Sequence, residues 1–155
     1  MDTFKKFEFD HLAVRKLFLQ FRQALQKGDM HQARRLQQTI FHELRVDKAS
    51  KEETFYPAAE QAGEEAEALV KKDKEELQTV EWLMEQVQRL DIGDAEFVAK
   101  MTALIDEMDR YAAEEERELL PKLREALGDE RLDQITGDLE QARRRQSLRQ
   151  GPTHG

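Results

Sequence analysis

Four side chains that could do chemistry interrupt two apolar stripes of helical spacing. Asp47 and Lys51 break the first stripe, and Tyr111 and Glu115 break the second. The apolar members are Ile40, Leu44 and Phe55 in one stripe, and Leu104, Met108 and Leu119 in the other. Positions three or four residues apart share a helix face, so the polar groups are predicted to point inward with the apolar ones. Because burying an unpaired charge is costly, we expect the two interruptions to meet in the core.

The two stretches match each other at a constant offset. Tyr111 lies 64 residues after Asp47, and Pro121 lies 64 residues after Pro57. A weaker match relates the stripe that begins at His11 to the stripe that begins at Leu77, at an offset of 66. The chain therefore has the pattern of a helical hairpin that occurs twice, and His11 is predicted to join the polar layer.

Three kinds of chemistry are open to such a layer. His11, Asp47 and Glu115 could hold one metal ion, because histidine and carboxylates from facing helices are the ligands that bundle cores use. A buried Lys51 with a lowered pKa could act as a base or as a Schiff-base nucleophile. The side chains could instead form a metal-free network in which Lys51 and a protonated His11 neutralise the two carboxylates.

Simpler structural interpretations apply to the same residues. His11 could be an ordinary hydrogen-bonded core histidine, and Tyr111 a core aromatic whose hydroxyl finds a partner. Asp47 and Lys51 could form an exposed i,i+4 pair, which contributes only about 0.3–0.5 kcal/mol. His31 and His42 lie off the stripes and are predicted at the surface. The run Arg143, Arg144 and Arg145 is interpreted as a basic helix end that favours the helix dipole.

The periodicity predicts five helices, over residues 10–27, 29–57, 65–90, 95–127 and 129–146. Asp10 is a candidate N-cap, Gly28 and Gly128 are candidate C-terminal residues, and Pro57 should kink or break the second helix. The fold class is predicted to be all-α: an antiparallel up-down four-helix bundle over residues 1–127. Residues 128–155 should add a short C-terminal helix and a disordered tail.

Composition excludes several classes of protein. The chain of 155 residues fits one domain, and its net charge of −8 makes nucleic acid an unexpected partner. The absence of cysteine excludes disulfides and thiolate sites, and it is compatible with a cytoplasmic location. No apolar run is long enough to cross a membrane, and the N-terminus does not have the pattern of a signal peptide.

Four segments resemble the hemerythrin-like HHE cation-binding domains: FDHLAVRKLF, IFHELRVDKASKEETFYPAAEQ, EELQTVEWLMEQV and YAAEEERELLPKL. The resemblance covers most of residues 7–127. It implies a four-helix bundle around a non-haem diiron centre. Its six ligand positions would be His11, Asp47, Lys51, Leu77, Tyr111 and Glu115.

The chain departs from that ligand pattern at four positions, since only His11 and Glu115 keep the residue that the resemblance implies. A protonated Lys51 cannot bind a cation, Leu77 has no donor atom, and Tyr111 could bind only as a phenolate. We therefore expect a degenerate metal site without a cofactor, with His11, Glu115 and in addition Asp47 as residual ligand positions. The expected site is a core polar network of His11, Asp47, Lys51, Tyr111 and Glu115, with no catalytic residue.

The functional expectation is a non-catalytic binding, sensing or scaffold domain. One alternative is an iron-binding protein that senses oxygen, nitric oxide or redox state, as the resemblance implies. A second alternative is an enzyme that uses the Lys51 pocket, although no substrate motif supports it. The sequence names no partner and leaves homo-oligomer formation open.

Overall fold

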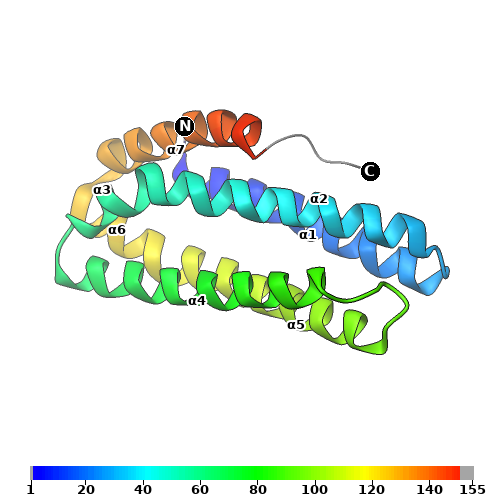
Figure 1. Cartoon of the computed structure of the whole chain (residues 1–155). Coiled ribbons are helices and arrows are strands. Elements are labelled where there is room, and N and C mark those ends of the chain that lie inside the picture. Colours follow the sequence, from blue (N-terminus) through cyan, green and yellow to red (C-terminus); the bar gives the residue numbers. More distant parts are fainter. Residues whose placement is uncertain (1, 151–155) are drawn as a thin grey trace.

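The computed structural model describes residues 2–150, and over this range the chain forms helices without a strand. The α-helices are α1 (Thr3–Gln26), α2 (Met30–Ser50), α3 (Tyr56–Glu60), α4 (Glu64–Gln88), α5 (Ala95–Glu114), α6 (Leu120–Leu127) and α7 (Asp129–Arg149). Two π-helical turns, η1 (Lys51–Phe55) and η2 (Glu115–Leu119), join α2 to α3 and α5 to α6. Figure 1 shows the four long helical segments running up and down beside one another, which confirms the predicted all-α bundle.

Local sequence accounts for most helix ends. The Asp29 side chain accepts a hydrogen bond from the backbone N–H of Gln32 at 3.0 Å, and it caps α2. Gly28 and Gly128 have φ values of 72° and 83°, a left-handed conformation that glycine adopts without strain. These two glycines end helices where the sequence predicts it.

The prediction that Asp10 caps the first helix is wrong. Helix α1 begins at Thr3, and the Asp2 side chain accepts from the backbone N–H of Phe4 and of Lys5. The physical reason is that Phe7 extends the apolar stripe toward the N-terminus and is itself buried, so burial stabilises the added turns. Asp10 lies inside α1 and pairs with Lys6 at 3.2 Å.

Pro57 and Pro121 widen their helices instead of breaking them. Proline has no backbone N–H, and its ring clashes with the carbonyl four residues earlier in a regular α-helix. One residue before each proline, the backbone N–H of Tyr56 bonds to the carbonyl of Lys51, and that of Leu120 bonds to the carbonyl of Glu115. These i to i+5 bonds define the π turns, which begin at Lys51 and Glu115.

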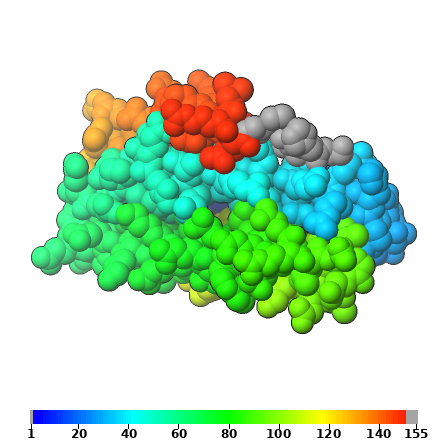
Figure 2. Space-filling model, viewed as in Figure 1, coloured from blue at the N-terminus to red at the C-terminus, as the bar shows by residue number. Residues whose placement is uncertain are grey.

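Helix α7 packs on the outer side of α2 and on η1, so the molecule is a bundle with a fifth helix across one face (Figures 1 and 2). Its buried apolar residues are Leu132, Ile135, Leu139 and Ala142. The division of the chain after residue 127 stays a prediction, and the predicted disordered tail, residues 151–155, lies outside the described residues. Within residues 2–150, no helix combines the length and hydropathy needed to cross a bilayer.

We expect Leu139→Ala to destabilise the protein by about 2–5 kcal/mol, because Leu139 is fully buried where α7 meets the bundle. Leu148→Ala is the matched control on the same helix: Leu148 is 85% exposed, so the free energy of unfolding should change by less than about 0.5 kcal/mol. Chemical denaturation measures both values. A loss below about 1 kcal/mol for Leu139→Ala would contradict a tightly packed α7.

Candidate functional site

Lys51 lies at the centre of the bundle with 1% of its surface exposed. Its ammonium donates to the Glu115 carboxylate and to the Tyr111 hydroxyl, both at 2.6 Å, and lies 3.0 Å from the Asp47 carboxylate. Three partners match the three protons of an ammonium group. They belong to α2, α5 and η2, so one cation connects both halves of the chain.

His11 adds the first helix to this cluster. Its Nε2 lies 3.1 Å from Glu115 Oε1, and its Nδ1 lies 3.2 Å from Glu116 Oε2. Glu115 is fully buried and uses one oxygen for His11 and the other for Lys51. From the helical spacing, Glu115 was the one residue of its glutamate run predicted to point inward, but the Glu116 carboxylate also lies close to His11. The structure thus brings together all five predicted network residues.

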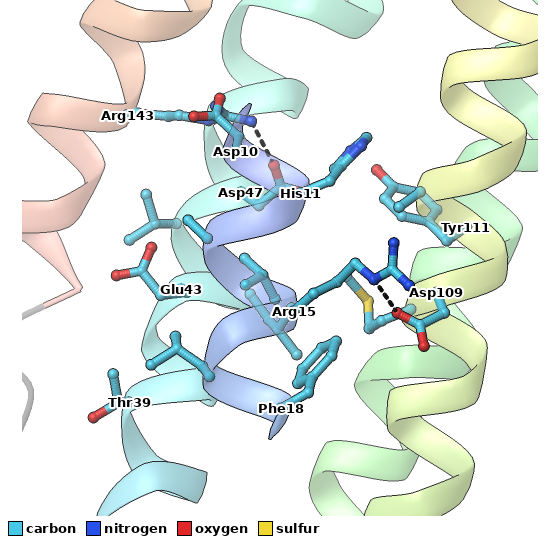
Figure 3. A pocket seen from close by; sticks show the side chains of 17 residues that line it. Asp10, His11, Arg15, Phe18, Thr39, Glu43, Asp47, Asp109, Tyr111 and Arg143 are labelled. Atoms are coloured by element: carbon cyan, nitrogen blue, oxygen red, sulfur yellow. Dashed lines mark hydrogen bonds and ion pairs between the residues drawn. The ribbon is translucent and has the colours of Figure 1, made fainter. Parts of the chain in front are cut away.

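Arg143 of α7 supplies a second cation that the sequence analysis assigned to a helix end. Its Nη2 donates to Asp47 Oδ1 at 2.8 Å, and its Nη1 bonds to the Asp10 carboxylate (Figure 3). Asp47 is therefore held between Lys51 on one oxygen and Arg143 on the other. A signal was present in the sequence, because Arg143 follows Leu139 by four residues and so shares the buried face of α7.

Tyr56 and Asp73 extend the network on the opposite side and were also missed. The Tyr56 hydroxyl donates to Asp73 Oδ2 at 2.6 Å and lies 3.2 Å from the Tyr111 hydroxyl. Asp73 is 4% exposed and sits one turn before Leu77 on α4. Leu77 is buried as predicted. The polar side chain that α4 contributes is Asp73, one turn earlier on the same helix face.

The histidines that were predicted at the surface differ in outcome. His31 is exposed, as expected, whereas His42 is only 8% exposed, so that prediction is wrong. Helix α7 covers the outer face of α2, and Ser147 Oγ lies 3.5 Å from His42 Nε2. A face that would be solvated in a simple four-helix bundle is buried here by the additional helix.

The electrostatics favour a charged Lys51 and a charged Glu115. Burial opposes the charge on Glu115, but the nearby Lys51 ammonium and His11 outweigh it and lower the pKa of Glu115 to about 2. Burial likewise opposes the charge on Lys51, yet Asp47 and Glu115 raise the pKa of Lys51 above its usual value. Burial lowers the pKa of His11, but the hydrogen bond to Glu115 and the negative charge of Glu115 outweigh burial and raise it.

Burial raises the pKa values of the remaining acidic groups. Burial, followed by the charge of Glu115, raises the pKa of Asp73 to about 9, so Asp73 is mostly neutral at pH 7. Burial also raises the pKa of Asp47, although Lys51 opposes this effect. Burial raises the pKa of Tyr111 well above its usual value, which disfavours a phenolate. The network therefore combines fixed charges with neutral hydrogen-bonding groups.

A cavity of about 400 Å³ adjoins this network (Figure 3). His11, Asp47 and Tyr111 belong to its lining, and Arg143 closes part of it from α7. Apolar side chains of α1, α2 and α5 form most of the remaining wall, namely Val14, Leu17, Phe18, Leu44, Met108 and Ala112. The size is within the range of small-molecule sites in proteins.

The six positions implied by the family resemblance do not fit a diiron centre. The Lys51 ammonium lies within 3.0 Å of the two carboxylates that would have to bind cations. Leu77 offers no donor atom, and both oxygens of Glu115 already accept from nitrogen partners. Among residues 2–150, no group of three or more His, Asp or Glu side chains is arranged to hold a metal ion. A site for a single metal ion at His11, Asp47 and Glu115 meets the same obstacle, because the Lys51 ammonium already contacts both carboxylates.

We expect Asp73→Asn to stabilise the protein increasingly as the pH rises from 5 to 7.5. Because the folded pKa of Asp73 is raised, the folded state binds more protons than the unfolded state, and the parent loses stability as the pH rises toward about 9. Asparagine can still accept from Tyr56 but does not titrate. The difference should grow by roughly 1–3 kcal/mol over this range.

Chemical denaturation at the two pH values measures this effect. Asp106→Asn is the control, because the side chain of Asp106 is 70% exposed and lies outside the network. Its effect should stay within about 0.5 kcal/mol at both pH values. If Asp73→Asn is equally or more destabilising at pH 7.5 than at pH 5, Asp73 is ionised in the folded protein.

The comparisons with known proteins agree with the bundle geometry. The model of the hemerythrin HHE cation-binding domain matches residues 2–123. An uncharacterized hemerythrin-like protein of Schizosaccharomyces pombe is 26% identical over 117 residues, which cover 75% of this chain and 58% of that protein. The chain thus corresponds to little more than half the length of this relative, and no solved structure matches it. From the match over most of its length, the chain belongs to the hemerythrin HHE cation-binding domain family.

Proposed function

We propose that the polar network centred on Lys51 replaces the diiron centre of this family, and that the domain acts in binding or sensing without catalysis. The observation that carries the proposal is the position of Lys51. Its ammonium lies within 3.0 Å of oxygens from Asp47, Tyr111 and Glu115, three residues at implied ligand positions. A fixed ammonium thereby neutralises carboxylates that a metal would otherwise bind.

Charge balance supports this proposal. Around the two innermost carboxylates, Lys51 and Arg143 bring two positive charges, and Asp47 and Glu115 bring two negative charges when ionised. At the edge of the cluster, Asp10 pairs with Arg143 and Lys6, and His11, whose pKa is raised, lies between Glu115 and Glu116. A neutral cluster is the form that a low-dielectric interior stabilises best.

The enzymatic alternative has less support. A lysine nucleophile or base needs a neutral amine at working pH, which requires a lowered pKa. The carboxylates around Lys51 raise its pKa, so the amine stays protonated. The family's role in binding iron and sensing oxygen, nitric oxide or redox state remains the principal alternative. We also propose a scaffold role and a cytoplasmic location.

We expect the purified protein to take up less than one iron atom per chain after anaerobic loading with ferrous iron and desalting. Elemental analysis measures iron, zinc and manganese in the same sample. The matched comparison is the variant Asp47→His, Lys51→Glu, Leu77→His and Tyr111→His, which restores the implied ligands and should bind iron. Two iron atoms per chain in the parent would overturn the proposal.

We also expect Lys51→Met to destabilise the protein by about 3–5 kcal/mol, because it leaves buried carboxylates without their cation. The penalty should shrink as the pH falls from 7.5 to 5. In the variant, burial and mutual repulsion should raise the carboxylate pKa values above those of the unfolded chain. The folded variant then binds more protons, so acid stabilises it relative to the parent.

Lys48→Met is the control, because Lys48 pairs with the partly exposed Glu52 and Glu81 and should contribute at most about 1 kcal/mol. Adding Asp47→Leu and Glu115→Leu to Lys51→Met should recover much of the loss, since Arg143 keeps Asp10 as its partner. Denaturation at both pH values measures all variants. A Lys51→Met penalty below about 1 kcal/mol at pH 5 and 7.5 would refute a lysine-centred network.

A further inference from the structure

Helix α1 carries large apolar side chains on its outer face as well as on its inner face. Phe7 and Phe18 are buried in the core, as expected for a surface helix of a bundle. Six large apolar side chains are exposed among residues 2–150, and three of them lie on α1: Phe9, Leu12 and Leu19, at 66%, 53% and 55%. Single exposed apolar residues are common, but three along one helix form a patch that a partner could cover.

These three residues share a heptad spacing with Lys16. Intervals of 3, 4 and 3 residues separate Phe9, Leu12, Lys16 and Leu19, which is the alternation of a and d positions in a coiled coil. Residues at this spacing form one stripe along the helix, and we call these four residues the α1 seam. Because the seam lies roughly opposite the stripe with which α1 faces the core, another helix could pack along it without displacing the bundle.

The surroundings of the α1 seam are basic, although the chain as a whole has a net charge of −8. Four cations are exposed on α1 against one carboxylate: Lys5, Arg15, Lys16, Arg22 and Glu8. Arg15 and Arg22 pair with α5 at 3.6 and 3.8 Å, and such long, exposed ion pairs contribute little (Figure 3). Lys16, in the middle of the seam, forms no ion pair among residues 2–150. This face of α1 therefore attracts an acidic surface.

We propose that the α1 seam is a docking site for an acidic amphipathic helix of a partner protein. The apolar stripe of the partner helix packs against the apolar residues of the seam, and one carboxylate within that stripe pairs with Lys16. Acidic residues beside the stripe face Arg15 and Arg22. The inference goes beyond the proposed function, because the network around Lys51 lies on the other side of α1 and takes no part in this contact.

Two other occupants fit the α1 seam less well. A second copy of the chain would place two such faces against each other, and each has four exposed cations and one carboxylate, so like charges would repel. A lipid surface favours a continuous apolar stripe, but Lys16 interrupts this one. Anionic lipids would attract the cations of α1 but repel the acidic remainder of the chain.

The experiment titrates the full chain at pH 7 with three synthetic peptides of four heptads. Two peptides have leucine at positions a and d and glutamate at positions e and g, and they differ at one central a position. The Glu-centred peptide has glutamate there, and the Lys-centred peptide has lysine. The third peptide has the composition of the Glu-centred peptide in scrambled order. Calorimetry measures the affinity, and backbone amide NMR locates the contact.

We expect the Glu-centred peptide to bind with a dissociation constant below about 100 μM, with amide shifts centred on α1. The Lys-centred peptide should bind about tenfold more weakly, because its lysine meets Lys16 in the seam. The scrambled peptide keeps the negative charge but has no apolar stripe, so it should not bind at about 1 mM.

Lys16→Glu should reverse the preference, so that the Lys-centred peptide binds about tenfold more tightly than the Glu-centred one. Leu12→Ser should weaken both by at least about tenfold, because it removes an apolar anchor. The matched controls are Lys71→Glu on α4 and Leu148→Ser on α7, which should change either affinity by less than about twofold. The four substituted side chains are exposed, so these variants should fold like the parent.

Equal affinity of the parent for the Glu-centred and Lys-centred peptides, absence of binding at about 1 mM, or seam variants that bind like the parent would overturn the inference. Sedimentation of the chain alone and binding to vesicles of phosphatidylserine and phosphatidylcholine test the other occupants. A dimer or a vesicle complex that Leu12→Ser abolishes would also overturn it, because a second copy or lipid would then cover the seam. The iron measurement reports on the network alone, so the proposed function does not depend on these outcomes.

Discussion

A buried ammonium group among carboxylates is the interaction on which the rest of the structure depends. Removing Lys51, Asp47 and Glu115 from water costs several kcal/mol for each ion, and only close mutual attraction offsets that cost. The distances of 2.6 and 3.0 Å from Lys51 to the two carboxylates supply this attraction. Any change that separates one partner leaves the others charged in a low-dielectric interior. The helices around them must therefore hold these side chains in one arrangement.

The backbone meets this requirement through two π turns and an additional helix. Each π turn begins at a network residue, Lys51 or Glu115, and each precedes a proline that a regular α-helix would not accommodate. Helix α7 then brings Arg143 to Asp47, so the Asp47 carboxylate lies between two cations. The layer is consequently asymmetric, although the sequence around it has the character of a duplicated hairpin.

On the other side of Lys51 the network changes from charges to neutral groups. Tyr111 accepts from Lys51 and contacts Tyr56, which donates to Asp73. The raised pKa of Asp73 keeps this end mostly neutral at pH 7, which limits the number of charges that the core must hold. The cavity lies toward the opposite end, beside His11, Asp47 and Arg143. The cavity thus adjoins the charged end of the network, and network side chains form part of its wall.

The sequence by itself determined the helical class, the two matched polar interruptions and the inward direction of five network residues. These features follow from helical periodicity, which is a local property that the spacing of residues along one helix reveals. His11, Asp47 and Lys51 could be assigned to one layer from their positions in the chain, because the offsets of 64 and 66 and the resemblance put the helices in register. The start of α1 was predicted seven residues too late, since amphipathic spacing locates faces better than ends.

Only the tertiary structure decided which partners complete the network. Arg143 and Asp73 lie 96 and 26 residues from Asp47, and their approach depends on how α7 and α4 pack, which no local pattern encodes. The burial of His42 likewise depends on α7 covering α2. The π turns were hidden as well, because a proline predicts strain but not how the helix relieves it. Long-range packing, rather than local propensity, selected among the alternatives that the sequence left open.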